Sequence, residues 1–184
     1  MKKEAVARNP FEVFRNVRVL TLMALFAAMS IIFGKLLAIN IGGTIRVSFE
    51  NLPLLMAGIF LGAPAGFITG VVADLIGCMI AGYSVNPIIT LGAGCIGLIA
   101  GLLFRMTEGQ KLPFRVYGSV MTAHIFASMI IKSAGLMIYY HYTLLAVVPR
   151  IPLYLVIGAA ESTLILMLMK NRAFSEQLGR MLKK

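Results

Sequence analysis

The stretch LPLLMAGIFLGAPAGFITGVVADLIGCMIAG, residues 52–82, decides how the chain is divided into helices. It is apolar almost throughout. It is too long for one membrane-spanning helix and short for two, since each span needs about 20 residues. Gly62-Ala63-Pro64 interrupts it with a turn and helix-breaking signal. The stretch is therefore either one kinked helix or a short hairpin of two, and the charge pattern of the chain decides between them.

The composition is that of an integral membrane protein. Of the 184 residues, 59% are hydrophobic and 13% are charged, with a mean hydropathy of +0.90. Soluble globular domains contain about 25% charged residues. The net charge of +10 raises the alternative of nucleic-acid binding, but basic residues also flank membrane spans on the cytoplasmic side. We therefore predict a multi-pass protein of the cell membrane without a nucleic-acid partner.

Apolar segments predict an all-α membrane protein with six transmembrane helices. The segments cover residues 19–41, 52–62, 64–82, 86–104, 116–142 and 148–170. The first segment follows a basic region, as the apolar part of a signal peptide does. It is too long for that part, so we predict a retained helix.

The positions of the basic residues predict that both termini are cytoplasmic. Basic residues gather before the first span, in the loop 105–115 and after the last span: Lys2, Lys3, Arg8, Arg15, Arg18, Arg105, Lys111, Arg115, Lys170, Arg172, Arg180, Lys183 and Lys184. An even number of spans places all three groups on one side. Six spans satisfy this pattern, whereas five spans break it.

The spans form one domain between two basic segments. We predict a cytoplasmic basic N-terminal segment at 1–18, a six-helix transmembrane domain at 19–170 and a basic amphipathic C-terminal segment at 171–184. The last segment is expected to rest on the inner membrane surface.

Two matches to nucleotide-binding motifs lie inside apolar spans and are discounted. GAGCIG at 92–97 fits the dinucleotide fingerprint by letter but lacks the strand before it and the acidic residue at the required distance. GCMIAGYS at 77–84 has Tyr83 where a phosphate-binding loop has lysine. Small residues at this spacing are typical of close helix packing.

The chain shows no spacing typical of catalysis or of metal binding. Its histidines, His124 and His141, are too far apart to share a helix turn, and Cys78 and Cys95 lie in apolar runs without a CxxC motif. We predict that the protein is not an enzyme and that it holds no cofactor, metal or disulfide.

Polar residues recur on single faces of the predicted helices. His124, Ser128, Lys132, Gly135 and Tyr139 follow a helical period, as do Arg150, Tyr154 and Glu161, and Asn86 and Thr90. Because charged groups inside a bilayer are costly, such groups are candidates for function. Asp74 could instead lock the fold through a neighbouring donor, and Lys35 could extend to the outer headgroups.

The loop before residue 52 has a different period. In GTIRVSFEN, residues 43–51, polar and apolar residues alternate, which predicts an extended segment in the first outer loop. Arg46 and Glu50 would share one face, while Phe49 would lie on the other and could stack on a ligand. Together with the polar helix faces, this segment predicts a chamber that opens outward under a lid.

The predicted chamber is acidic in its interior and basic near its outer end. Asp74 and Glu161 lie deep, whereas Arg46, Lys132 and Arg150 lie further out. A ligand with an amino-substituted heterocycle at one end and a carboxylate at the other would match this gradient. The candidate substrate-binding residues are Arg46, Phe49, Glu50, Tyr83, Asn86, His124, Lys132, Tyr139, Arg150, Tyr154 and Glu161.

RVSFENLPLLMAGIFLGAPAGFITGVVADLIG (46–77) and PRIPLYLVIGAAES (149–162) resemble the S component, the substrate-binding membrane subunit, of energy-coupling factor (ECF) vitamin transporters. The folate-specific branch is the most similar. Ala24 and Ala28 resemble the AxxxA docking motif of this family.

The resemblance implies a binding subunit of an ATP-driven importer. Such a subunit takes one vitamin, here folate, from outside. It then docks on a transmembrane coupling subunit driven by two cytoplasmic ATPases and tilts in the membrane to release the vitamin. The outer loops at 42–51, 83–86 and 143–149 become gate candidates by the same resemblance.

Other functions stay open at the level of sequence. The chain could be an S component for another vitamin, or a proton-coupled secondary carrier that works alone through Asp74 and Glu161, although no inverted repeat is visible. An intramembrane enzyme is a third alternative, and it lacks any nucleophile or metal spacing.

Overall fold

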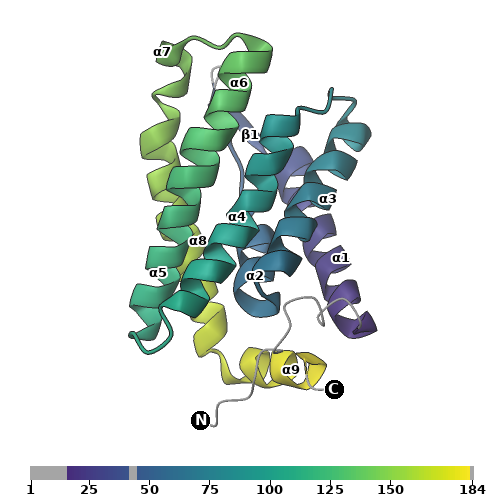
Figure 1. Ribbon diagram of the computed structural model, residues 1–184, viewed down its shortest axis with the longest axis vertical. Helices are drawn as coiled ribbons and strands as arrows, with labels where there is room; N and C mark the ends of the chain where they lie inside the picture. The colour runs from purple at the N-terminus through teal and green to yellow at the C-terminus, as the bar shows by residue number, and fades with distance from the viewer. Residues whose placement is uncertain (1–15, 42–44, 183–184) are drawn as a thin grey trace.

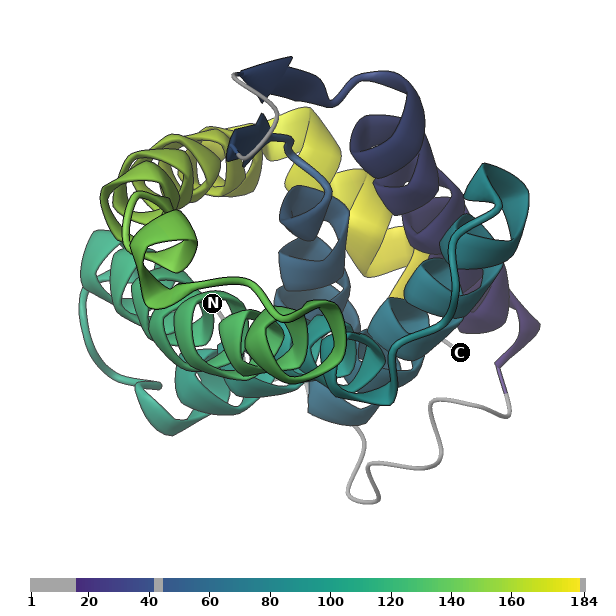
Figure 2. The ribbon, with the colours of Figure 1, turned by 90° about the horizontal axis from the view of Figure 1, so that it is seen from above.

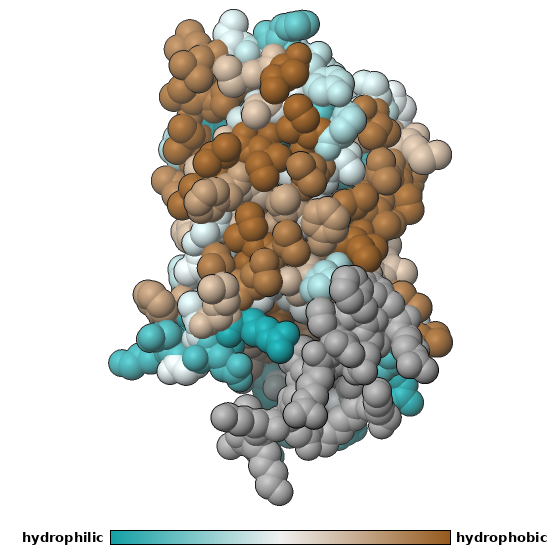
Figure 3. All heavy atoms as spheres, in the orientation of Figure 1, coloured by the Kyte–Doolittle hydropathy of each residue, from teal (hydrophilic) through white to brown (hydrophobic). Residues whose placement is uncertain are grey.

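The computed structural model describes residues 16–41 and 45–182 as a bundle of helices along a common axis (Figure 1). Within these residues, five helical stretches are long and apolar enough to cross a membrane: Val17–Leu36, Ala63–Ala81, Pro87–Met106, Leu112–Tyr140 and Leu144–Lys170. Hydrophobic residues cover most of the face seen in Figure 3, and hydrophilic residues gather toward its lower end. The prediction of a helical membrane protein is confirmed.

Residues 52–82 form two helices, α2 (Asn51–Leu61) and α3 (Ala63–Ala81), which meet at Gly62. Gly62 has a φ of 101°, a left-handed conformation that glycine adopts without a steric penalty. Pro64 lies in the first turn of α3, where its missing N–H leaves no intrahelical bond unmade. The hairpin of two helices is thus the correct alternative.

Helix α2 is shorter than a full span. It has 11 residues, and a helix rises about 1.5 Å per residue against a hydrocarbon core of about 30 Å. The count of six spans and the cytoplasmic side of both termini therefore stay predictions.

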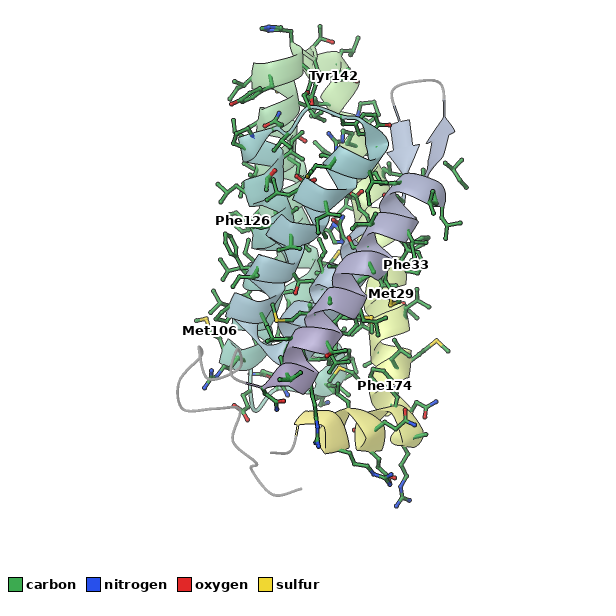
Figure 4. The ribbon with its side chains drawn as sticks, turned by 90° about the vertical axis from the view of Figure 1, so that its right-hand side faces the viewer. Met29, Phe33, Met106, Phe126, Tyr142 and Phe174 are labelled. Carbon is green, nitrogen blue, oxygen red and sulfur yellow. The ribbon has the colours of Figure 1, made fainter. Side chains whose placement is uncertain are left out.

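The C-terminal helix α9 (Arg172–Leu182) crosses the end of the bundle near the end of α2 (Figure 1). The ring of Phe174 packs on Phe60 with centroids 5.5 Å apart, and Figure 4 shows Phe174 between α9 and the bundle. At this residue the apolar side of α9 faces protein. The contact of α9 with the membrane surface stays a prediction.

Glycine residues bring α2, α3 and α4 (Pro87–Met106) into backbone contact. A Cβ atom built on Gly97 would lie 2.5 Å from the carbonyl oxygen of Gly66, and one on Gly58 would collide with the carbonyl of Gly97. Lipid provides no hydrophobic drive between helices, so such close packing is what holds them together. The glycines of the 92–97 match therefore act in helix packing.

A continuous helix covers α5 (Leu112–Ala123), the π-helical segment η3 (His124–Lys132) and α6 (Ser133–Tyr140). His124, Ser128 and Lys132 are buried, as predicted for one face. Tyr139 departs from the prediction, because its side chain is 51% exposed. The wider turns of a π-helix rotate the residues that follow away from the ordinary helical period.

The first loop contains an antiparallel hairpin of β1 (Ile39–Ile41) and β2 (Ile45–Val47), in which Asn40 pairs with Arg46. The predicted extended segment is confirmed. Its predicted length is wrong, since Glu50 has helical dihedral angles and precedes the first residue of α2. Glu50 therefore does not share a strand face with Arg46.

The remaining helices complete the bundle. They are α1 (Val17–Ile31), which continues as the π-helical η2 (Ile32–Leu36), the short α7 (Leu144–Val147) and α8 (Arg150–Lys170). Seen along the bundle axis, α5, α6 and α8 lie on one side and α1 and α3 on the other (Figure 2).

The core contains both apolar and polar side chains. Leu54, Ile96, Val116, Val120 and Ile165 are almost fully buried. The polar side chains of Asn51, His124, Ser128 and Glu161 are also almost fully buried. We use "hairpin end" for the end that carries β1 and β2, the α3–α4 loop and the α6–α7 turn (Figure 1).

Candidate functional site

A chain of polar side chains connects η3 with α8, and we call it the deep polar chain. His124 Nε2 lies 2.6 Å from Glu161 Oε2, and both side chains are fully buried. The other ring nitrogen of His124, Nδ1, is 3.3 Å from Ser128 Oγ. The predicted faces of these two helices thus meet through His124 and Glu161, which lie 37 residues apart.

The deep polar chain continues from Glu161 along α8 toward the hairpin end. The ring of Tyr154 stacks on that of His124 with centroids 5.7 Å apart. Arg150 donates a hydrogen bond from Nη2 to Tyr154 Oη at 3.0 Å, and its guanidinium lies 5.4 Å from the centre of the Tyr154 ring. Four residues predicted from two helix faces therefore form one connected unit: Arg150, Tyr154, His124 and Glu161.

Two atoms of the deep polar chain are buried without a hydrogen-bond partner among the described residues. They are Glu161 Oε1 and Arg150 Nη1. An unsatisfied polar group in a protein interior costs about 1–3 kcal/mol, and more when it is charged. An acceptor at one end and a donor at the other are what a polar ligand would satisfy.

A second polar unit, the lysine bridge, links η3 to the start of α2. Lys132 Nζ donates to Asn51 Oδ1 at 3.0 Å and to Glu50 Oε1 at 3.2 Å. Ser30 Oγ of α1 donates to the backbone oxygen of Glu50 at 2.7 Å. Lys132 shares η3 with His124 of the deep polar chain, and with Asp74 of α3 it lines a small space beside Glu50. The bridge therefore borders both groups.

An outer cavity of about 420 Å³ opens among η2, α3, α4 and α6 at the hairpin end. Its lining residues are Lys35, Glu50, Asp74, Cys78, Gly82, Tyr83, Ser84, Asn86, Ile89, Leu136, Tyr140 and Tyr142. Pockets for small molecules typically measure about 300–1,000 Å³. The volume is therefore sufficient for a small organic ligand.

Three of the predicted site residues line the outer cavity: Glu50, Tyr83 and Asn86. Asn86 also has a structural role, because its Oδ1 accepts from the backbone N–H groups of Ile88 and Ile89 and its Nδ2 donates to the carbonyl of Gly135. This amide caps α4 and ties it to α6, which leaves it few hydrogen bonds for a ligand.

Three other predicted residues stand apart from both polar units. Tyr139 and Phe49 are exposed, and neither lines the outer cavity. Arg46 lies in β2, but its side chain is outside the described part of the structure. For these residues a ligand contact stays a prediction.

The structure adds residues that the sequence did not single out as ligand contacts. Asn51 is 1% exposed and holds Lys132, and Tyr140 replaces Tyr139 at the cavity wall. Asp74 accepts a hydrogen bond from Thr90 Oγ1 at 2.6 Å, as the fold-locking alternative predicted, but it also lines the cavity.

Lys35 could extend to the outer headgroups, and this stays a prediction. Its ammonium lies 5.0 Å from the centre of the Tyr83 ring, and the side chain lines the outer cavity. The sequence did contain a signal for Asn51, because a polar residue directly before the apolar run 52–82 is a candidate for a buried polar contact. The choice of Tyr140 over Tyr139 had no signal in the sequence, because the π-helical turns are not visible there.

Helix α1 presents small residues on its outer face. Ala24 and Ala28 are exposed, whereas Met23, Phe26 and Ala27 pack into the core. The predicted docking residues are therefore accessible on the outside of the bundle. Within the described residues, no three His, Cys, Asp or Glu side chains are placed to hold a metal ion, and Cys78 and Cys95 form no disulfide.

The family model for the ECF-type riboflavin transporter S component matches residues 14–171. The chain belongs to this family. The S component is therefore a membrane transport subunit and not an enzyme, as the sequence predicted.

Two solved structures share the fold of this S component. The crystal structure of FolT bound with folic acid superposes with a TM-score of 0.66 at 22% identity, covering 91% of this chain and 95% of FolT. A structure of the S component of a bacterial ECF transporter gives a TM-score of 0.64 at 18% identity, covering 92% and 99%. These likenesses confirm the helical fold.

One curated relative is 30% identical over 94 residues, the "Uncharacterized protein MG313 homolog" of Mycoplasma pneumoniae. The match covers 51% of this chain and 33% of that protein, so the S component spans about a third of the relative's length.

Proposed function

We propose that this S component binds folate from outside the cell and delivers it through an ATPase-driven coupling module. The observation that carries the proposal is the deep polar chain, with its unsatisfied Glu161 Oε1 at one end and Arg150 Nη1 at the other. The folate-bound neighbour of the same fold supports the choice of vitamin.

The spacing of these two residues suits an elongated ligand. Arg150 and Glu161 are both in α8, and their separation of 11 residues corresponds to about 16 Å along the helix axis. A carboxyl group can accept from, or donate to, the polar edge of an aminopyrimidinone ring, and a guanidinium binds a carboxylate through two hydrogen bonds. Folate carries the ring at one end and carboxylates at the other.

Docking on the coupling module is assigned to the exposed face of α1. Ala24 and Ala28 lie there side by side on one helix face, where the absence of bulk lets a partner helix approach closely. The proposed partners are a transmembrane coupling subunit and two cytoplasmic ATPases, which would supply the energy of release.

Riboflavin is the second candidate, because the matching family is described by that vitamin. Its flat ring system also carries neighbouring N–H and C=O groups. It has no carboxylate, however, so Arg150 would be left to bind a hydroxyl group. The unsatisfied guanidinium nitrogen favours folate over riboflavin.

Titration calorimetry of the purified protein with folate and with riboflavin tests the proposal. We expect stoichiometric binding of folate and an affinity that falls about tenfold to a hundredfold in Glu161→Gln and in Arg150→Ala. Glu108→Gln and Arg105→Ala are matched controls, since both residues are exposed near the α4–α5 turn. If the protein binds riboflavin and not folate, riboflavin replaces folate as the proposed vitamin. If it binds neither vitamin, the proposal is rejected.

A further inference from the structure

The outer cavity is separate from the deep polar chain. Its lining comes from η2, the start of α2, α3, α4, α6 and the loops of the hairpin end, and includes none of Arg150, Tyr154, His124 and Glu161. Lys132 connects the two, because it donates to Glu50 of the cavity lining and shares η3 with His124. A cavity of about 420 Å³ is therefore present beside the lysine bridge, with a lining distinct from the site to which we assign the vitamin.

An acceptor and a donor in this cavity have hydrogen-bonding capacity to spare. Thr90 occupies Asp74 Oδ2, while no described residue donates to Oδ1. Lys35 makes no ion pair or hydrogen bond with a described residue, and its ammonium lies over the ring of Tyr83. Asp74 and Lys35 are not paired with each other, although both line the cavity. Charged groups inside a membrane protein usually face a partner or a pathway.

Aromatic rings supply the rest of the wall. Tyr83, Tyr140 and Tyr142 line the cavity, and all three remain between 39% and 57% exposed. Tyr140 and Ser84 hold each other through their hydroxyl groups, 3.3 Å apart, which ties the α6 end to the α3–α4 loop. Figure 4 shows Tyr142 at the end of the bundle opposite to α9. The cavity thus borders the surface at the hairpin end.

We infer that the outer cavity is a first binding site for the flat ring of the vitamin, occupied before the deep polar chain. Its ligand is a fused heterocycle with a neighbouring N–H donor and C=O acceptor, which Asp74 and Lys35 would meet while a tyrosine ring stacks on its face. Both folate and riboflavin carry such an edge. The inference rests on the proposed function, because it takes the transported vitamin as the ligand.

A first site changes the kinetics of binding in a defined way. The vitamin would form a weak complex in the outer cavity and then pass the lysine bridge in a slower second step. The observed rate of binding then levels off as the vitamin concentration rises, and the half-saturating concentration measures the weak complex. Binding in one step would give a rate that rises linearly.

Stopped-flow mixing of the purified protein with folate and, separately, with riboflavin tests the inference. Tyrosine emission is the protein signal, because the chain has no tryptophan. We expect a saturating rate in the wild type. Asp74→Asn and Lys35→Met should raise the half-saturating concentration about tenfold, with the equilibrium affinity unchanged. Glu108→Gln and Lys111→Met, both at exposed residues, are the matched controls.

The outcomes separate this inference from the proposed function. A linear rate in the wild type, or a half-saturating concentration within about twofold of the wild type in both variants, overturns the first site while folate binding stands. Loss of equilibrium affinity in Asp74→Asn and Lys35→Met also overturns it, since the two residues would then belong to the final site. Absence of binding of either vitamin to the wild type rejects the proposed function and the inference together.

A second measurement guards against variants that fold poorly. In the double variant Glu161→Gln and Arg150→Ala, calorimetry should detect weak residual binding of the vitamin, and adding Asp74→Asn should abolish it. Residual binding that survives Asp74→Asn would contradict the assignment to the outer cavity. Each variant is compared at equal helicity by circular dichroism.

Discussion

His124 and Glu161 form a fully buried pair, with 2.6 Å between Nε2 and Oε2. They join η3 to α8 across 37 residues of sequence. Removing one member of a buried pair leaves its partner without compensation, and this costs about 3–5 kcal/mol. The pair therefore supports the fold as well as the proposed vitamin site.

We predict that His124→Asn lowers the free energy of unfolding by about 3 kcal/mol, because the shorter side chain cannot reach Glu161. Thermal unfolding in detergent measures the loss. His141→Asn is the matched control, because His141 is exposed and its φ of 52° suits asparagine. Equal stability of the two variants would contradict the role of the pair.

A methyl group at Gly97 should separate α4 from α3. The new Cβ would lie 2.5 Å from the carbonyl oxygen of Gly66, so one backbone must move. We predict that Gly97→Ala lowers the free energy of unfolding by about 1–3 kcal/mol. In α5, Gly118 has no atom within 4 Å of the position its Cβ would take. Gly118→Ala should therefore be neutral or stabilising by up to about 1 kcal/mol.

The lysine bridge should act as a barrier between the outer cavity and the deep polar chain. Lys132→Met removes the bonds to Glu50 and Asn51, 3.2 and 3.0 Å long. We predict that the limiting rate of vitamin binding and the rate of dissociation both rise about tenfold, with the affinity unchanged. Stopped-flow kinetics measures both rates, with Lys111→Met as the control. A weaker affinity at an unchanged limiting rate would instead make Lys132 a direct vitamin contact.

Bulk on the outer face of α1 should block coupling without harming the vitamin site. Ala24 and Ala28 are exposed, so Ala24→Leu and Ala28→Leu have room in the isolated subunit. We predict normal vitamin binding by calorimetry and at least about tenfold slower uptake by cells that express the coupling module. Val156→Leu adds bulk at a site on α8 that is 69% exposed and should leave uptake unchanged. Normal uptake in both alanine variants would place the docking surface elsewhere.

The helical period predicted site residues correctly where the helix is regular and incorrectly where it is not. The period of α8 correctly joined Arg150, Tyr154 and Glu161, because α8 is a regular helix from Arg150 to Lys170. The period after His124 correctly grouped Ser128 and Lys132 but misplaced Tyr139, since the π-helical segment ends just before α6. Lys35 lies beside Tyr83, a contact between distant segments that local periodicity does not predict.

The sequence by itself determined the helices of this protein and the break between α2 and α3. Apolar run length, Gly62 and Pro64 act within a few residues, and the membrane requires each backbone polar group to bond within its own helix. Only the tertiary structure decided that Lys132 meets Glu50, 82 residues away, and that Glu161 meets His124. Those pairs depend on how each helix is rotated and how closely glycines let the helices approach, which are properties of packing between distant segments.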